Sequence, residues 1–455
     1  MPTSLKVNAV DAARLTSAYP EVFRRSFAQR FGLALGAGIT ALYLALCFVA
    51  FDVGPAFVNG RWDRASVYLQ DWYSWRAQPR LRFEGGAVVP QWSSRGQYPP
   101  GAEIDWLRPL PDGGYSVIYE DADNRVDVRA TKVDIYIDGT RWPVAVTEDG
   151  VVPPPATEEN PYPATLSYDG GKVVVTYGFE GQAEIRSSQV FVQRRFLGWA
   201  NFFFDTRSPF WGKSFGELVR LAAIGDRLDP ARSNLVHMGD DFLGNRVWQH
   251  ADILSKLLQT LVMAFVGTLL ATLFAFPLAF LAARNITRSR LATWGMKRAF
   301  DFLRSIDMLI WALFFTRGFG PGPIPGIAAI FFTDAGALGK VYAEALENVD
   351  DRQREGVKSV GASPALVNRY GVVPQVLPVF ISQSLYFWES NTRSATIIGA
   401  VGAGGIGLKL LEAMGTNADW DKVAYMVLLI LLVVFVFDAI SNALRSRLIG
   451  GPGHC

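Results

Sequence analysis

The sequence contains few of the residues that bind metals or form disulfide frameworks. Its 455 residues include only two cysteines, Cys47 and Cys455, and three histidines, none at the spacing of a zinc site. We therefore expect neither a metallohydrolase nor a redox enzyme, and no metal, cofactor or catalytic residue. The net charge is only +2, so we expect no nucleic acid partner, because phosphate-backbone binding needs a basic surface.

Charge is absent from two long stretches of the chain. Residues 31–51 and 257–283 contain no Asp, Glu, Lys or Arg, and about 20 apolar residues span the hydrocarbon core of a bilayer. Further apolar regions lie at about 303–318, 326–343, 373–407 and 423–443. The pattern predicts an integral membrane protein with about six helices in the lipid bilayer.

Basic residues indicate the orientation of these spans. They gather in residues 1–30, 284–304 and 445–447, and an excess of Lys and Arg marks the cytoplasmic side. We interpret 31–51 as an uncleaved anchor helix, because its apolar stretch is too long and too deep for an ordinary signal peptide. Both termini, as segment 1–30 and tail 448–455, are then expected in the cytoplasm.

The region between the first two spans, residues 52–250, has a different character. Val133, Ile135 and Ile137 alternate with polar residues, as in a half-buried strand, and the hairpin dipeptide Asp138-Gly139 follows. A second pair, Asp169-Gly170, precedes another apolar run. We predict an antiparallel β-rich core at about 80–195, inserted outside the membrane into an otherwise all-α polytopic protein with a helical domain at 251–447.

A glycine motif near the end of the fifth span matches G-x-G-x-x-G. Its glycines are Gly402, Gly404, Gly405 and Gly407. A dinucleotide site would need a βαβ unit around the motif, which the apolar context does not favour. We expect these glycines to permit close helix approach or a bend beside a pathway. The chain also has no phosphate-binding P-loop, so any ATP-driven work must come from a partner.

The loop 344–374 contains the most informative pattern. It reads Glu355-Gly-Val-Lys-Ser-Val-Gly361, then nine residues, then Gly371-Val-Val-Pro374. The spacing resembles the EAA loop of binding-protein-dependent ABC importer permeases. Gly356, Val357, Gly371 and Val373 depart from the general pattern, but they are similar to the phosphonate permease subfamily. The likeness covers roughly 31–51 and 255–447 and leaves the β-rich insertion unexplained.

Physical reasoning about this loop supports an ATPase-coupling role. A short pair of charged helices between two spans can seat in a groove of a cytoplasmic ATPase, with Glu355 directed at the partner. Gly361 would allow the turn between the helices, since glycine accepts backbone angles that other residues avoid. Gly356, Gly371 and Pro374 complete the predicted coupling residues. A solvated loop without a partner is the plainer alternative.

Charged residues inside the fifth span are candidates for function, because they are costly in a membrane. Glu389 and Arg393 are four residues apart and share one helix face, so they can pair. Arg393 would then either contact an anion in the pathway or only complete a structural ion pair, and the sequence leaves both open. Asp307 and Asp438 are assigned to the third and sixth spans.

The resemblance implies a function in transport. It implies an inner-membrane permease subunit of an ABC importer for phosphonate, or for a related oxyanion such as phosphate or phosphite, and not an enzyme. The implied partners are an ABC ATPase subunit, a periplasmic phosphonate-binding protein and a second permease copy, expected as a homodimer in the family's two-fold arrangement. The alternatives are a permease for methionine or another small solute, and a membrane-anchored binding or sensor protein acting through its β domain.

Overall fold

The computed structural model describes residues 27–60, 62–92, 98–99, 102–147, 150–155, 161–416 and 420–449. The chain divides into two compact units, residues 1–67 and 68–455. Most of the predicted cytoplasmic segment 1–30 and of the tail 448–455 lies outside the described residues.

The first unit is built on one apolar helix. α3 (Phe27–Ala50) covers the predicted span 31–51 up to its last residue, because no charge interrupts this Leu- and Ala-rich stretch. The backbone turns at Asp52, whose φ of 48° is left-handed. Two short helices follow, α4 (Val53–Val58) and α5 (Trp62–Gln70), the latter crossing the boundary between the units.

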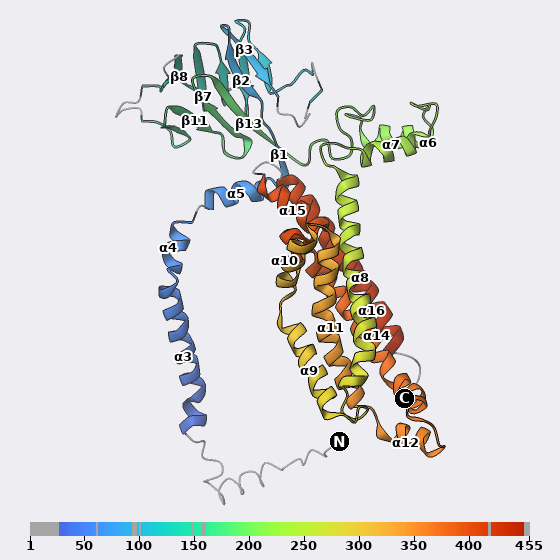
Figure 1. Cartoon of the computed structure of the whole chain (residues 1–455). Coiled ribbons are helices and arrows are strands. Elements are labelled where there is room, and N and C mark those ends of the chain that lie inside the picture. The colour runs from blue at the N-terminus through green and yellow to red at the C-terminus, as the bar shows by residue number, and fades with distance from the viewer. Residues whose placement is uncertain are drawn as a thin grey trace, which may run out of the picture. The chain divides into compact units, whose positions relative to one another are not determined.

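The second unit begins with two antiparallel sheets that enclose one apolar core (Figure 1). The seven-stranded sheet has the order β10-β11-β12-β13-β2-β3 with β1 on β13, and the six-stranded sheet runs from β4 to β9 in sequence order. The strands are β1 (Ser74–Ala77), β2 (Arg80–Glu84), β3 (Ala87–Gln91), β4 (Leu107–Pro109), β5 (Tyr115–Ile118), β6 (Arg125–Val128), β7 (Lys132–Ile137), β8 (Thr140–Thr147), β9 (Gly150–Val152), β10 (Leu166–Asp169), β11 (Lys172–Thr176), β12 (Gly181–Ile185) and β13 (Gln189–Leu197).

Both predicted hairpins are present in these sheets. β7 and β8 pair from Ile137↔Thr140, with Asp138 and Gly139 between them at φ values of 47° and 75°. Positive φ at both loop residues is the geometry of a type I′ turn, which matches the twist of the strands. β10 and β11 pair from Asp169↔Lys172, so the second turn contains two glycines. The antiparallel β prediction is confirmed.

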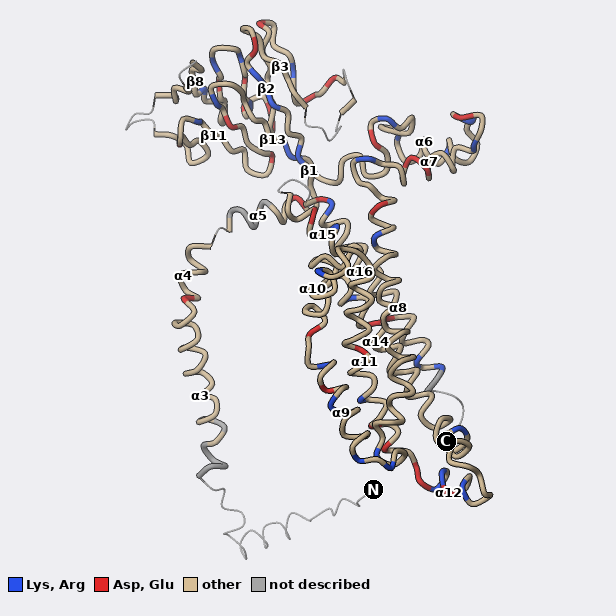
Figure 2. Tube along the Cα trace, in the orientation of Figure 1, with Lys and Arg blue, Asp and Glu red and all other residues tan. Residues whose placement is uncertain are grey.

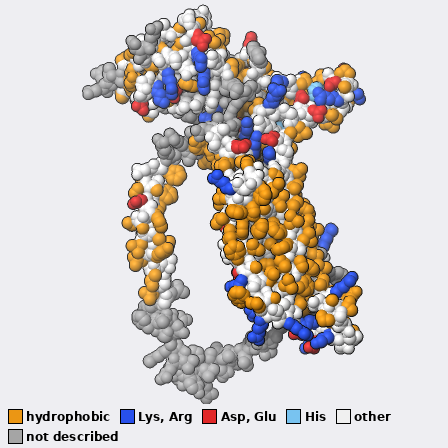
Figure 3. All heavy atoms as spheres, viewed as in Figure 1, with side chains coloured by type: hydrophobic (Ala, Val, Ile, Leu, Met, Phe, Trp, Pro, Cys, Tyr) orange, Lys and Arg blue, Asp and Glu red, His pale blue; other side chains and the backbone are white. Residues whose placement is uncertain are grey.

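Helices make up the rest of the second unit. They are α6 (Phe215–Ala223), α7 (Asn234–Leu243), α8 (His250–Ala282), α9 (Arg290–Ser305), α10 (Met308–Phe319), α11 (Pro323–Glu347), α12 (Asp351–Ser359), α13 (Pro364–Val367), α14 (Val373–Ile398), α15 (Gly405–Gly415) and α16 (Trp420–Ile449). Within the described residues, α8, α11 and α16 are long and apolar enough to cross a membrane, and α14 with α15 adds a fourth if this bent pair is one span. Apolar side chains cover the middle of this bundle (Figure 3).

The predicted span 303–318 is wrong as a single helix. The structure divides it between the end of α9 and the start of α10, a 12-residue apolar helix. Asp307 causes the division: its carboxylate accepts a hydrogen bond from the Leu309 backbone N–H at 2.8 Å and caps α10. Asp307 is therefore a helix cap and not a charge within a helix.

Small residues let the central helices pack closely. On α8, Ala271, Ala275 and Ala279 are fully buried at a spacing of four residues. A Cβ at Gly267 would lie 2.7 Å from the Ile330 side chain on α11. Small residues on a shared face allow helices in a bilayer to approach until their backbones nearly touch.

An aromatic cluster joins the segment after β13 to the helical bundle. The Trp248 indole donates a hydrogen bond to the Ala200 carbonyl at 2.8 Å. Both ring nitrogens of His250 form hydrogen bonds: Nδ1 lies 3.0 Å from the Tyr425 hydroxyl, and Nε2 lies 2.7 Å from the Phe202 carbonyl. These contacts fix the first turn of α8 and the start of α16 to the same stretch of chain.

Candidate functional site

The predicted coupling loop forms a short exposed helix held between long helices. α11 ends at Glu347, and α12 follows after Asp350, whose carboxylate accepts a hydrogen bond from the Arg352 backbone N–H at 3.0 Å. No residue of α12 is buried, and both Glu355 and Gly356 are exposed. A helix without a buried face contributes little to the core of its own chain, so its outer surface is free to contact another molecule.

The turn after α12 depends on glycine. Gly361 has a φ of +81°, in the left-handed region that side chains with a Cβ avoid, and its N–H donates to the Lys358 carbonyl at 3.0 Å. The chain then continues through α13 and a π-helical turn into α14. Gly371 is buried in this turn, where an added Cβ would lie 3.4 Å from the Arg354 Cα, and Pro374 lies in the first turn of α14.

The base of the loop is anchored to the connection between α8 and α9. Asn285 donates from its side chain to the Leu346 carbonyl at 2.8 Å, and its own carbonyl accepts from Arg354 at 3.3 Å. The Glu347 carboxylate accepts from the Arg284 backbone N–H at 2.8 Å. A push on α12 would therefore be passed to both α8 and α11.

The glycine motif forms a bend between two helices. Its residues connect α14 to α15 at an angle of 60°, with Gly402 at φ +104° and Gly404 at φ +80°. No strand adjoins it, because the stretch before it belongs to α14, so the structure lacks the βαβ setting of a dinucleotide site there.

Each glycine of this bend lies against a different neighbour. A Cβ at Gly402 would meet Thr316 of α10 at 3.0 Å, and one at Gly404 would meet the backbone of Gly322 at 3.1 Å. A Cβ at Gly405 would overlap Thr260 of α8, and one at Gly407 would overlap a carbonyl of α14; the Thr260 hydroxyl in turn accepts from the Ile406 backbone N–H at 2.9 Å. The bend therefore lies where α8, α10, α14 and α15 meet.

The predicted pair Glu389 and Arg393 is looser than a hydrogen-bonded ion pair. The carboxylate of Glu389 accepts from Arg445 of α16 at 2.9 Å, whereas Arg393 lies 3.9 Å from Glu389 and 3.8 Å from Asp438. The Arg393 side chain is 49% exposed. Arg445 thus neutralises Glu389, and Arg393 retains donors that none of these contacts uses.

Sequence reasoning missed a polar cluster inside the bundle. Asp334 on α11, Thr268 on α8 and Asn391 on α14 are each at most 3% exposed. The Asn391 amide donates to the Thr268 hydroxyl at 2.7 Å and to the Asp334 carboxylate. The sequence could have indicated this cluster, because Asp334 is a charged residue in the middle of the predicted span 326–343, and such residues are costly in a membrane.

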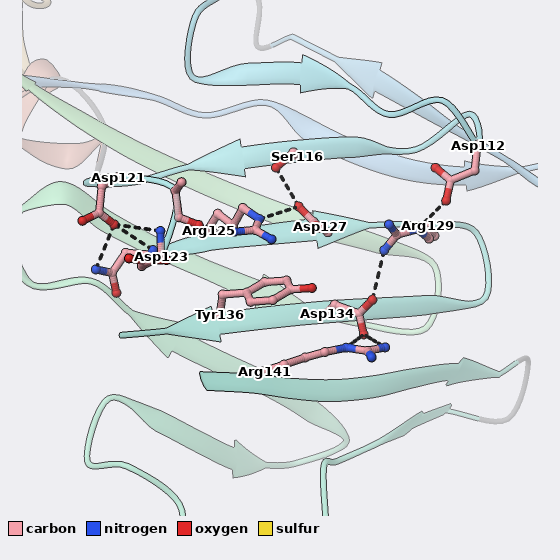
Figure 4. A network of polar contacts seen from close by, with 12 residues as sticks. Asp112, Ser116, Asp121, Asp123, Arg125, Asp127, Arg129, Asp134, Tyr136 and Arg141 are labelled. Carbon is pink, nitrogen blue, oxygen red and sulfur yellow. Dashed lines mark hydrogen bonds and ion pairs between the residues drawn. The ribbon is translucent and has the colours of Figure 1, made fainter. Parts of the chain in front are cut away.

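The β domain carries a separate polar network on its six-stranded sheet (Figure 4). The carboxylate of Asp134 on β7 accepts from Arg129 at 3.0 Å and from Arg141 on β8 at 2.8 Å. Arg129 also donates to Asp112 and so holds the pKa of that carboxyl below its ordinary value. Across the described residues, no group of three or more His, Cys, Asp and Glu side chains could hold a metal ion.

A family model and several known proteins that match this chain all describe transport permeases. Residues 275–450 match the model of the binding-protein-dependent transport system inner membrane component. The chain is 38% identical to the phosphite transport system permease protein PtxC of Stutzerimonas stutzeri, over 46% of this chain and 74% of that protein. It is 34% identical to the phosphate-import permease protein PhnE of Mycolicibacterium smegmatis, over 48% and 40%.

A third relative is the putative cryptic phosphonate transport system permease protein PhnE2 of Escherichia coli, 41% identical over 27% of this chain and 98% of that protein. The family match contains the exposed helix α12, the Gly361 turn and the glycine bend, and it ends at residue 450, near the end of α16. The chain belongs to the family of binding-protein-dependent transport system inner membrane components.

Proposed function

We propose that this protein is the permease subunit of an ATP-driven importer that moves a phosphorus oxyanion, a phosphonate, phosphite or phosphate, across the inner membrane. The exposed helix α12 on its anchored base carries the proposal, because it gives an ATPase subunit a surface that is linked through Arg354 and Asn285 to the connection after α8 and to the end of α11. The names of the three relatives support the substrate class.

The proposed topology has six crossings. α3, α8, α11, α14 and α16 each cross once, and the sixth crossing is the predicted span 303–318, in which the last residues of α9 precede α10, because α10 alone, at 12 residues, is only about 18 Å long. Both termini and α12 then face the cytoplasm, where the basic residues gather, and the β domain lies outside. The β domain is placed to meet a substrate-binding protein.

Arg393 is the proposed contact for the substrate inside the pathway. A half-exposed guanidinium cannot face lipid at low cost, so a second copy of the chain or a water-filled path must lie against it. Both acidic neighbours are at least 3.8 Å away, which leaves its donors available for an oxyanion. Two copies would form the pathway, and the contact would be weak enough for the substrate to leave.

The alternatives differ in which part of the chain acts. A permease for methionine or another solute would keep the same coupling helix and change only the substrate. A binding or sensor protein would act through the β domain and would not need α12.

Growth on defined phosphorus sources tests the proposal. A strain lacking this gene and other phosphorus importers is supplied with 2-aminoethylphosphonate, methylphosphonate, phosphite or phosphate. We expect the wild-type gene to restore growth on at least one of them. Failure on all four, with the protein present in the membrane, would contradict the substrate class.

A matched pair of glycine substitutions tests the coupling helix in the same strain. Gly361→Val forces a β-branched residue into a left-handed turn, at a cost of about 1–2 kcal/mol or more, and we expect it to abolish growth by misplacing α12. Gly216→Ala, at an open position of α6 outside the coupling loop, should be tolerated, since alanine favours a helix over glycine by about 1 kcal/mol. Equal growth of both variants would contradict the coupling role.

A further inference from the structure

A basic cavity lies beside the connection between α8 and α9. Its volume is about 800 Å³. Figure 2 shows Lys and Arg gathered at this end of α9. Five cationic side chains line the cavity: Arg284, Arg288, Arg290, Lys297 and Arg298.

The described part of the chain neutralises only some of this positive charge. Lys297 pairs with Glu347 at 2.8 Å, and Arg298 lies 3.3 Å from Asp301. The side chains of Arg288 and Arg290 make neither an ion pair nor a hydrogen bond with any described residue. Uncompensated like charges around one cavity repel each other unless an anion binds between them.

A buried hydroxyl adds a second feature that points to a ligand. Thr293 lines the cavity, is only 4% exposed, and has a hydroxyl oxygen without a hydrogen-bond partner among the described residues. A buried hydroxyl usually has a partner, and leaving it unpaired costs about 1–3 kcal/mol. The first turn of α9 begins at the same place, and the N-terminus of a helix favours negative charge.

Exposed apolar residues border the cavity. Leu291 is 78% exposed and Trp294 is 62% exposed, both on the first turns of α9. Tryptophan and basic residues side by side are typical of the level of lipid headgroups, and basic pockets beside membrane helices bind anionic lipids.

We propose that this cavity binds a phosphate group, held by Arg288 and Arg290 with the Thr293 hydroxyl as a further donor. Guanidinium groups bind phosphate through paired charge-assisted hydrogen bonds. The phosphate belongs either to the headgroup of an anionic phospholipid or to free inorganic phosphate, and the same side chains serve both. This site is independent of the proposed substrate pathway.

Binding to the purified full chain in a neutral detergent tests the site in two arms. The first arm titrates inorganic phosphate against chloride at equal ionic strength and follows the melting temperature. The second arm adds mixed micelles of phosphatidylglycerol or of phosphatidylcholine, and native mass spectrometry counts the lipids retained. Saturable stabilisation in the first arm identifies free phosphate, and selective retention of phosphatidylglycerol identifies the lipid.

Three variants make the test specific. R288Q combined with R290Q should weaken binding of the responding probe about tenfold or more, because each removes a charge-assisted hydrogen bond. Thr293→Val keeps every charge and should weaken binding several-fold, which a merely electrostatic effect would not produce. Arg304→Gln, on the same helix outside the cavity, should bind as the wild type does.

Several results would overturn the proposal. One is that neither probe binds saturably, and another is that all three variants bind as tightly as the wild type. A third is that R288Q with R290Q leaves both probes unaffected and instead releases a bound ATPase subunit, which would assign the cations to a protein contact.

Discussion

A buried aspartate in the β domain and one in the helical bundle have different kinds of partner. In the β domain, the nearly buried Asp134 has two arginine partners of its own, Arg129 and Arg141. In the bundle, the equally buried Asp334 has only the neutral donors Thr268 and Asn391. Among the exposed charges of the helical part, Glu355 on α12 has no ion pair within the described residues.

The difference indicates what each set of charges does. Paired charges in the sheet stabilise the β domain itself and leave little free charge there for a ligand. Charges that are unpaired or only loosely paired, namely Glu355 on α12, Arg393, and Arg288 and Arg290 in the basic cavity, are available to molecules outside the chain. Substitutions in the two regions should therefore change different properties: stability in the β domain, and transport or binding in the bundle.

The largest effect is expected at Glu355. Glu355→Lys should lower uptake of the transported oxyanion about a hundredfold, because a reversed charge at a protein interface costs several kcal/mol. Uptake by whole cells, normalised to the amount of protein in the membrane, measures the effect. Glu103→Lys reverses the charge of an exposed residue in the β domain and should leave uptake unchanged. An equal loss of uptake in both variants would contradict the claim that charges in the two regions have different roles.

Arg393 should give the next effect. Arg393→Gln should lower uptake about tenfold through the loss of a charge-assisted hydrogen bond, and Arg393→Lys should restore part of it. The melting temperature of the purified chain should stay the same, because the acidic neighbours are 3.8 Å away or more. A lower melting temperature with normal uptake would instead assign Arg393 to a structural ion pair.

The same substitution at the two buried aspartates compares the regions directly. Asp134→Asn leaves Arg141 without a counter-charge and Arg129 with Asp112 alone, and it should destabilise the β domain by about 2 kcal/mol, less than a fully buried pair because water reaches both arginines. Hydrogen exchange of the β7 and β8 amides should speed up accordingly. Protection equal to the wild type would show that the network contributes nothing to stability.

Asp334→Asn should give the smallest effect, below about 1 kcal/mol, because an amide oxygen can still accept from Thr268 and Asn391. Asp334→Leu removes the acceptor and should cost about 1–3 kcal/mol. Thermal melting of both variants measures the difference. A large loss with Asn would show that the bundle requires the acidic group itself.

Local sequence patterns predicted the parts of the fold that depend on neighbouring residues. Alternation at 133–137 and the Asp138-Gly139 turn predicted a hairpin because strand period and turn chemistry are short-range. Uncharged runs predicted α3 and α8 for the same reason. The pairing order of the sheets depends on contacts between distant residues, which one sequence does not contain.

The break inside the third predicted span was missed because hydropathy does not detect helix caps. Asp307 looked like a charge inside a membrane helix, but its carboxylate ends one helix and begins another. The cluster of Thr268, Asp334 and Asn391 was missed because its members are far apart in sequence and meet only when α8, α11 and α14 pack together.

Site-specific cross-linking tests the central claim most directly. A photoreactive amino acid replaces Glu355 in one full-length variant and Glu103 in another, and cells that also produce the cognate ATPase subunit are irradiated. The account predicts an adduct containing that ATPase from position 355 and none from position 103. No adduct from position 355, or equal adducts from both positions, would contradict the claim that α12 is the surface this protein presents to its partner.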